Sequence, residues 1–144
     1  MKQILLIMIG TSLLLQAGFT RDSSGVVADN ATGLAWQDDY GDNAEVIKKS
    51  TWQEVLVYCE ELSLGGKNDW RLPNKNELFS IVDMSKYSPV ISSIFTNVTP
   101  NRYWSSTSAV SDPSAAWIVS FENGYVSWYN KTDDYSVRCV RGGQ

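Results

Sequence analysis

The chain has 144 residues, with 12 basic and 16 acidic side chains, two cysteines and no histidine, which gives a formal charge of −4. This length fits a single domain. Without histidine, Ser-His-Asp or Cys-His catalysis and imidazole-bound zinc are excluded, and two cysteines alone cannot build a four-thiolate metal site. The acidic balance argues against a nucleic acid or an anionic membrane surface as a partner, because both attract cationic proteins.

The first 17 residues are predicted to be a signal peptide. A basic residue, Lys2, precedes an apolar run over 4–15, and small residues follow at Ala17 and Gly18. Because the run is shorter than the roughly 20 residues that span a bilayer, we expect cleavage after Ala17; an uncleaved membrane anchor is the alternative. Residues 18–144 would then be one exported domain, secreted or held in the periplasm or cell envelope, with no membrane insertion after cleavage.

A β-hairpin is predicted at the start of the mature chain. The runs Val26–Ala28 and Leu34–Gln37 are strand-like, and Gly33 in the turn between them is available for a positive φ. The stretch 38–49 is polar and is interpreted as a surface loop.

Two helices follow, each with the pattern of a capping box, in which side chains at the first turn bond reciprocally to backbone amides. The first box is Thr51–Glu54 and the second is Asn74–Glu77. Helical spacing predicts one buried face on each helix. These faces are Trp52, Val55, Leu56, Cys59 and Leu62 on the first, and Leu78, Ile81 and Val82 on the second.

Residues 83–101 have no clear period and contain Pro89 and Pro100, so we expect a long ordered loop. Its apolar side chains, expected to hold it in place, are Met84, Tyr87, Val90, Ile91, Ile94 and Phe95.

The final segment is rich in aromatic and β-branched residues, which are typical of strands. Its four strand-like runs are Tyr103–Thr107, Ala116–Phe121, Tyr125–Tyr129 and Tyr135–Arg141. Asn123-Gly124 between the second and third is a strong hairpin signal. Strands, then helices, then strands predict an α+β domain with a small antiparallel sheet.

The predicted export also indicates the oxidation state of the two cysteines. In an oxidising compartment, Cys59 and Cys139 are expected to form a disulfide. The bridge would link the first predicted helix to the last strand, and the chain-entropy model values such a long loop at about 4.5 kcal/mol of stability.

Several sequence runs, taken in order, resemble the Legionella collagen-like protein C-terminal domain family, a domain of unknown function. The resemblance covers nearly the whole mature chain. The runs are Asp29–Trp36, Thr51-Trp52 with Tyr58-Cys59, Gly66–Pro73 with Glu77-Leu78, Tyr103–Thr107 and Val137–Arg141.

A more distant resemblance, through Trp52, Tyr58-Cys59, Arg71–Pro73, Glu77 and Arg138-Cys139, is to formylglycine-generating enzymes. It implies a C-type-lectin-like fold, with two helices packed on small antiparallel sheets, and a structural disulfide between the matching cysteines. Those enzymes need a further reactive cysteine pair, which this chain lacks, so oxidase chemistry is not expected.

No cofactor and no metal site are expected. The residues Asn68-Asp69-Trp70 are of the same types as the Trp-Asn-Asp triplet of calcium-binding C-type lectins, but their order differs. They are interpreted as a turn. The acidic doublets are interpreted as solvated surface, because adjacent carboxylates point apart; they are Asp38-Asp39, Glu60-Glu61 and Asp133-Asp134. The chain is therefore not expected to be an enzyme. Arg71, Arg138 and Arg141 are expected to be structural ion-pair partners.

The C-terminal aromatic residues provide the candidate ligand surface. Trp104, Trp117 and Trp128 are expected to fill the core, and strand alternation would bury Val126 beside Trp128. The opposite face would then be an exposed aromatic and polar rim, suited to a sugar ring or a protein epitope. The candidate ligand-binding residues are Tyr125, Ser127, Tyr129, Asn130, Asp133 and Asp134.

These features predict an exported, lectin-like recognition or adhesion domain that binds a glycan or protein ligand. The alternative is a structural or assembly module of the cell envelope without a small ligand.

Overall fold

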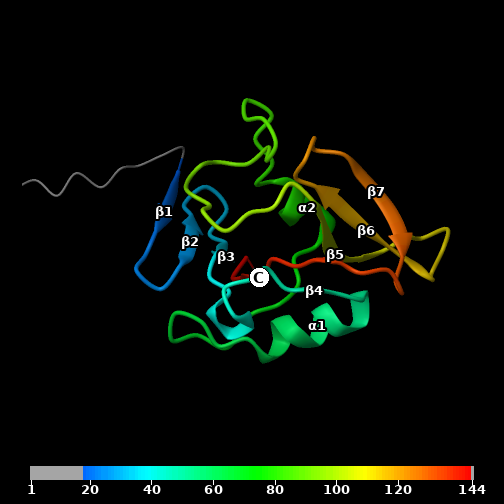
Figure 1. The fold of residues 1–144 in the computed structure, drawn as a ribbon, viewed down its shortest axis with the longest axis horizontal. Coiled ribbons are helices and arrows are strands. Elements are labelled where there is room, and N and C mark those ends of the chain that lie inside the picture. Colours follow the sequence, from blue (N-terminus) through cyan, green and yellow to red (C-terminus); the bar gives the residue numbers. More distant parts are fainter. Residues whose placement is uncertain (1–17, 144) are drawn as a thin grey trace, which may run out of the picture.

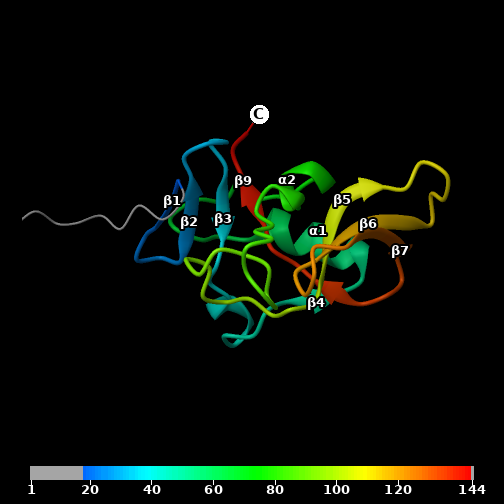
Figure 2. The same cartoon turned by 90° about the horizontal axis from the view of Figure 1, so that it is seen from above.

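Two β-sheets and two α-helices make up residues 18–143, the part of the chain that the computed structural model describes. The predicted α+β class is confirmed, whereas the expected signal peptide, residues 1–17, lies outside the described residues. The sheets lie toward opposite ends of the long axis, with helix α2 (Lys75–Phe79) between them (Figures 1 and 2). Helix α1 (Trp52–Glu61) runs along one side in Figure 1.

The smaller sheet contains the predicted hairpin. Strands β2 (Val26–Asp29) and β3 (Ala35–Gln37) pair antiparallel, and Gly33 has a φ of +74°, as its place in the turn requires. The hairpin is therefore confirmed. A short strand that the sequence pattern did not predict, β1 (Phe19–Arg21), pairs with β2, and β9 (Val140–Arg141) pairs with β3.

The larger sheet has the strand order β4-β8-β5-β6-β7. Its long strands are β5 (Arg102–Ser108), β6 (Ala115–Ser120) and β7 (Val126–Asn130), and the antiparallel pairing of β6 with β7 confirms the hairpin predicted at Asn123-Gly124. The short strands are β4 (Lys49–Ser50) and β8 (Tyr135–Ser136). Strand β8 pairs with β5 in parallel, unlike the antiparallel pairs around it.

The last predicted strand, Tyr135–Arg141, is divided in two. Its first residues form β8 in the larger sheet and its last form β9 in the smaller one. The segment therefore passes from one sheet to the other, and the three residues between the strands, 137–139, are fully buried or nearly so. A single strand was the wrong prediction because apolar alternation does not show where a chain changes its pairing partner.

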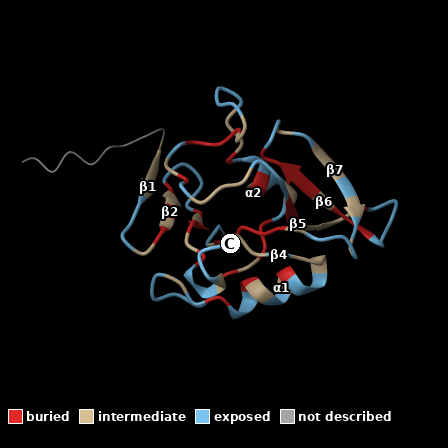
Figure 3. Cartoon of the chain, in the orientation of Figure 1, coloured by how far each residue is buried: buried red, intermediate tan, exposed pale blue. Residues whose placement is uncertain are grey.

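The strands β5 and β6 are buried on both faces because they separate two apolar clusters. Tyr103 and Val119 face the cluster that includes Leu78 of α2, whereas Trp104 and Ile118 face the cluster that includes α1. Figure 3 shows β6 as largely buried and β7 beside it as mostly exposed or intermediate. The core is therefore arranged in layers around this strand pair.

The two predicted capping boxes have different outcomes. At α2, the Asn74 side chain accepts from the Glu77 amide at 2.8 Å, and Glu77 accepts from the Asn74 amide at 2.9 Å, so that box is confirmed. At α1, the Thr51 side chain makes no capping hydrogen bond, and the Glu54 carboxylate accepts from the Ser50 hydroxyl as well as from the Thr51 amide. The prediction of a complete box at α1 is wrong, although the helix itself and the burial of Val55, Cys59 and Leu62 are confirmed.

The long loop 83–101 is held by only some of the side chains expected to hold it. Val90, Ile91 and Phe95 are buried, but Met84 and Tyr87 are 68% and 94% exposed. The backbone instead fastens the loop, for example where the Val90 amide donates to the Phe121 carbonyl.

Candidate functional site

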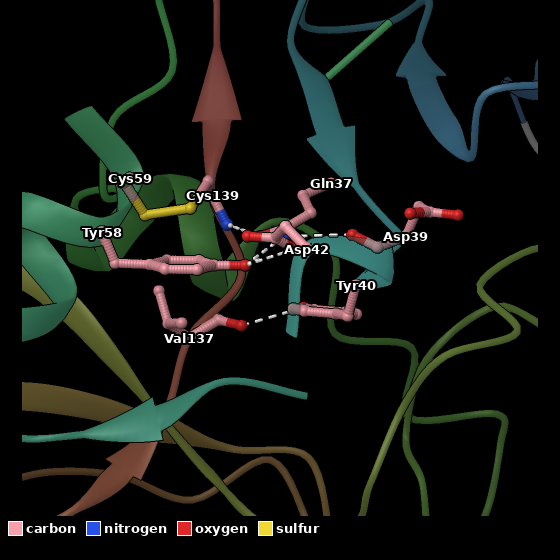
Figure 4. The surroundings of a disulfide bond; sticks show 8 residues. All are labelled: Gln37, Asp39, Tyr40, Asp42, Tyr58, Cys59, Val137 and Cys139. Atoms are coloured by element: carbon pink, nitrogen blue, oxygen red, sulfur yellow. Dashed lines mark hydrogen bonds between the residues drawn. A yellow bond between two sulfur atoms is a disulfide. The ribbon is translucent and has the colours of Figure 1, made fainter. Parts of the chain in front are cut away.

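The predicted disulfide is present and joins α1 to the segment before β9. Cys59 and Cys139 are fully buried, and their Cα atoms are 5.5 Å apart. Beside the bridge, the Gln37 side chain accepts from the Cys139 amide at 3.1 Å and donates to the Tyr58 hydroxyl at 2.9 Å (Figure 4). Burial raises the pKa of the Tyr58 hydroxyl. The cysteines are a buried structural link rather than an exposed reactive pair.

Asp38 is not part of a solvated acidic surface, so that prediction is wrong. Its carboxylate is fully buried and is paired with two guanidinium groups, those of Arg138, at 2.8 Å, and Arg21. The Thr96 amide donates to the same carboxylate at 2.8 Å. Arg138 also donates to the Asn97 carbonyl at 2.6 Å. A buried charge is tolerated when such partners surround it, and this network ties the N-terminal sheet to the 83–101 loop and the C-terminal run.

Tyr40, in the same stretch 38–49, is also buried although the stretch was interpreted as a surface loop. Its hydroxyl donates to the Val137 carbonyl at 2.8 Å (Figure 4), and burial raises its pKa well above the ordinary tyrosine value. The remainder of the stretch does lie near the surface and includes a short 3₁₀ helix, Gly41–Asn43.

The three arginines predicted to be structural partners do form ion pairs. Arg71 forks onto both oxygens of Glu77 at 2.7 Å each, and Arg141 binds Asp69 at 2.7 Å. The Arg71 guanidinium lowers the pKa of the Glu77 carboxyl, because it donates hydrogen bonds to the charged form. The guanidinium groups of Arg71, Arg138 and Arg141 are therefore all paired with carboxylates.

The C-terminal surface contains a hollow of about 270 Å³ beside the start of β5 and the short strand β8. We call it the C-terminal hollow. Two of the predicted ligand residues line it, Tyr125 and Asp134, and both are exposed. Further lining side chains are Lys49, Arg102, Glu122 and Tyr135.

A cluster of aromatic rings in edge-on contact supports one wall of the C-terminal hollow. The Tyr135 ring packs edge-on against buried Trp104 at 5.0 Å and against Tyr129 at 5.5 Å. The Arg102 guanidinium lies over Tyr129 at 4.5 Å and over Tyr135 at 5.7 Å, measured to the ring centroids. Such cation–π contacts are worth about 0.5–1 kcal/mol at exposed sites. The rings thus hold an exposed cation at the rim of the hollow.

The other predicted ligand residues do not line the hollow. Tyr129 lies half-buried below Arg102, and Ser127 pairs with Ile118 of β6. Asn130 closes the turn after β7, where its side chain accepts from the Thr132 amide at 3.0 Å. Asp133 is exposed, 3.5 Å from the Tyr135 hydroxyl. Of the six predicted residues, two therefore line the hollow and four do not.

Sequence reasoning missed Lys49, Arg102 and Glu122. Lys49 and Arg102 reach the hollow because β4 pairs with β8, and β8 pairs in parallel with β5. A prediction of the β4-β8-β5 pairing would have been needed to find these two. Glu122 instead lies in the turn between β6 and β7, three residues before Tyr125, so the predicted hairpin could have indicated it.

Trp128 is not a core residue as expected. It is 43% exposed on β7, the edge strand of the larger sheet, while Trp104 is fully buried and Trp117 is intermediate. The rings of Trp117 and Trp128 pack at 4.8 Å, and the Lys75 ammonium lies 4.1 Å from the Trp117 ring centroid. Val126, on the same face of β7, packs against the core cluster that includes Leu78. Alternation therefore placed both residues on one face but did not show that this face is covered at Val126 and not at Trp128.

Within residues 18–143, no group of three or more acidic, cysteine or histidine side chains is placed to hold a metal ion. In the same described range, no helix has the length and apolar character needed to cross a membrane.

The sequence model of the Lcl C-terminal domain family matches residues 25–141. This range includes the disulfide, the buried Asp38–Arg138 pair and every lining residue of the C-terminal hollow, whereas Arg21 lies before it. No curated protein matches the chain.

Proposed function

The chain belongs to the Lcl C-terminal domain family, and we propose that it is an exported, bacterial recognition or adhesion module that binds a glycan or protein ligand without catalysis. It acts in the periplasm, at the cell envelope or after secretion. Its fold is C-type-lectin-like, a proposal supported by two helices, two small sheets and a disulfide that links the first helix to the C-terminal segment.

The observation that carries the proposal is the C-terminal hollow itself. Tyr125 is 54% exposed at its edge, and Asp134 and Arg102 present charged groups beside it. Flat apolar area next to orientable polar groups suits a sugar ring or a peptide segment. The buried disulfide and the Asp38 network stabilise the fold that supports this rim.

Glycan arrays and pull-down experiments with the mature protein test the proposal. Binding of the recovered ligand should weaken on Tyr125→Ala and on Asp134→Ala, because both side chains line the hollow. Tyr87→Ala is the matched control, since Tyr87 is 94% exposed but lies in the 83–101 loop and does not line the hollow. If no substitution from Tyr125 to Asp134 changes the affinity for the ligand, the hollow is not its binding site.

Export is tested separately by fractionating the native host and measuring the mass of the intact protein by mass spectrometry. The mass of a chain that starts at Gly18, found in the periplasmic or extracellular fraction, supports the proposal. A full-length chain in the cytoplasm would contradict it.

A structural or assembly role is the second candidate, favoured by the exposed Trp128 on the edge strand β7. An unpaired strand edge is a ready site for pairing with another chain. Size-exclusion chromatography with light scattering distinguishes the two roles. A stable oligomer that dissociates on Trp128→Ser but not on Tyr125→Ala would favour assembly over ligand capture.

A further inference from the structure

Arg102 differs from the other arginines of the described chain in having no carboxylate partner. Within residues 18–143, each of the others forms an ion pair within 4.0 Å, and Arg102 forms none; the pairs are Arg21 and Arg138 with Asp38, Arg71 with Glu77, and Arg141 with Asp69. Its guanidinium instead lies on the rings of Tyr129 and Tyr135. One hydrogen bond joins the guanidinium to the Tyr135 hydroxyl, and the remaining N–H donors of the cation are available to an incoming acceptor.

The carboxylates at the same hollow are also unpaired. Glu122 and Asp134 line it and are exposed, and in the part of the chain described here neither carboxylate has an ion pair within 4.0 Å. Lys49, which lines the hollow as well, forms no such pair either. Two free cations and two free anions thus surround one hollow of about 270 Å³.

The balance of these charges indicates what the hollow can accept. A polyanion would meet Glu122 and Asp134, and a polycation would meet Lys49 and Arg102. A neutral sugar would leave all of these charged groups without a counter-charge. A small molecule that carries both a carboxylate and an ammonium group can satisfy both signs, while Tyr125 and Tyr135 offer apolar area to the carbon atoms between its charges.

Arg102 is also held in place before any ligand arrives. Because two rings hold its guanidinium, less side-chain entropy is lost when it binds a carboxylate than for a free surface arginine. A ring-supported cation beside exposed carboxylates is therefore a preorganised arrangement for a ligand with two opposite charges.

We propose that the C-terminal hollow binds a small zwitterion with a free amino group and a free carboxylate, either an α-amino acid or a short peptide. Arg102 receives the carboxylate, and Glu122 and Asp134 receive the ammonium group. This inference rests on the proposed role of the hollow as a ligand site, and it assigns that site a small zwitterion in place of a glycan or a whole protein.

The test is isothermal titration calorimetry of the mature protein at low ionic strength, where exposed charges are least screened. The probes are alanine, alanyl-alanine, its N-acetyl derivative and its C-terminal amide, with methyl glucoside as a neutral molecule. We expect saturable binding of at least one zwitterionic probe. If the dipeptide binds, each blocked form should bind roughly tenfold more weakly or worse, since each loses a charge-assisted contact. Preference for alanine or for alanyl-alanine decides between a free amino acid and a peptide.

Variants then assign the two charges of the ligand. Arg102→Gln should weaken binding of the zwitterion by roughly tenfold or more and should abolish the distinction between free and amidated carboxylate. Asp134→Asn combined with Glu122→Gln should abolish the distinction between free and acetylated amine. Lys67→Gln and Glu60→Gln are matched controls, because both residues are exposed and neither lines the hollow.

The outcomes separate this inference from the broader proposal. The inference is overturned if no zwitterionic probe binds, if blocked and free dipeptides bind equally, or if Arg102→Gln leaves binding unchanged. Where a glycan or protein ligand is lost on Tyr125→Ala but the zwitterions do not bind, the recognition role stands and the zwitterion site fails. The probe comparison uses the unaltered protein, so it remains decisive even if the Arg102 variant is unstable.

Discussion

At the scale of single residues, Asp38 shows how a carboxylate in a polar stretch becomes part of the interior. It accepts hydrogen bonds from Arg138, which lies 100 residues further along the chain, and from the Thr96 amide of the 83–101 loop. Removing one member of a buried ion pair leaves the other charge without compensation. The pair is therefore expected to matter more for stability than any exposed carboxylate of the chain.

Asp38→Asn is expected to destabilise the fold by about 3 to 5 kcal/mol, because it leaves Arg138 and Arg21 without their shared counter-charge. Urea unfolding of the variant and the wild type measures this difference. The matched control is Asp134→Asn at an exposed position, expected to change stability by no more than about 0.5 kcal/mol. Equal effects from the two substitutions would contradict the structural role assigned to Asp38.

The ionisation of Glu77 is expected to make the stability of the fold depend on pH. Arg71 lowers the pKa of this carboxyl in the folded state, so the folded state binds its proton less readily than the unfolded state does. The stability that the pair contributes is present above the ordinary glutamate pKa of 4.5 and is lost as the pH falls through the lower folded value. Glu77→Gln should thus destabilise the protein at neutral pH and cost much less in strong acid.

Unfolding free energies of the wild type and Glu77→Gln, measured across this pH range, test the linkage. Arg71→Gln should remove the larger part of the same pH-dependent component, since Arg71 lowers the pKa of Glu77 most and the Asn74 amide contributes the rest. A cost of Glu77→Gln that stays constant from neutral pH to strong acid would argue against the pair as its source.

At the scale of elements, the two helices begin differently even though their sequence patterns look alike. α2 is only five residues long, and both halves of its capping box are made. α1 has ten residues and starts without a side-chain bond from Thr51. Its amphipathic face, with Val55 and Cys59 fully buried, supplies the packing that a short helix must partly replace with caps.

Asn74→Ala should therefore cost about 1 kcal/mol of stability, the ordinary loss for an N-cap side chain. Thr51→Ala should cost less than about 0.5 kcal/mol, because no capping bond is lost there. Thermal or urea unfolding of both variants makes the comparison. A larger loss at Thr51 than at Asn74 would mean that the α1 cap forms in solution.

At the scale of the whole molecule, the Cys59–Cys139 bridge joins α1 to the segment that passes between the two sheets. The cysteines are 80 residues apart in sequence, so the bridge restricts most of the unfolded mature chain. A free-thiol assay on the denatured protein from the periplasm should find no reactive thiol. Two reactive thiols would show that the bridge does not form in the native host.

Replacing both cysteines by alanine should lower the free energy of unfolding by about 4.5 kcal/mol on the chain-entropy model. Urea titration measures the loss. Trp36 and Trp104 lie in different core clusters, so agreement between tryptophan fluorescence and circular dichroism tests whether the variant still unfolds as one unit. A loss near zero would show that packing around Gln37 and Tyr58 holds these segments together without the covalent link.

Several features of the protein could be read from local patterns. The hairpin turn at Gly33, the buried face of α1, the cap of α2 and the Asn123-Gly124 connection all depend on residues within a few positions of one another. Residues close in sequence determine these local structures, so the predictions made from them hold in the folded protein. The pairing of the cysteines followed from their number and expected compartment.

Other features depended on contacts that no local pattern contains. Asp38 is buried because distant arginines reach it, and Trp128 is exposed because the core clusters do not extend over its part of β7. The candidate site illustrates the same limit: Tyr125 and Asp134 could be proposed from composition, but Arg102 joins them only through the parallel pairing of β5 with β8. Local chemistry thus decided the helices and the hairpins, whereas long-range pairing decided how the last strand is divided, which charges are neutralised in the core and which stay free at the surface.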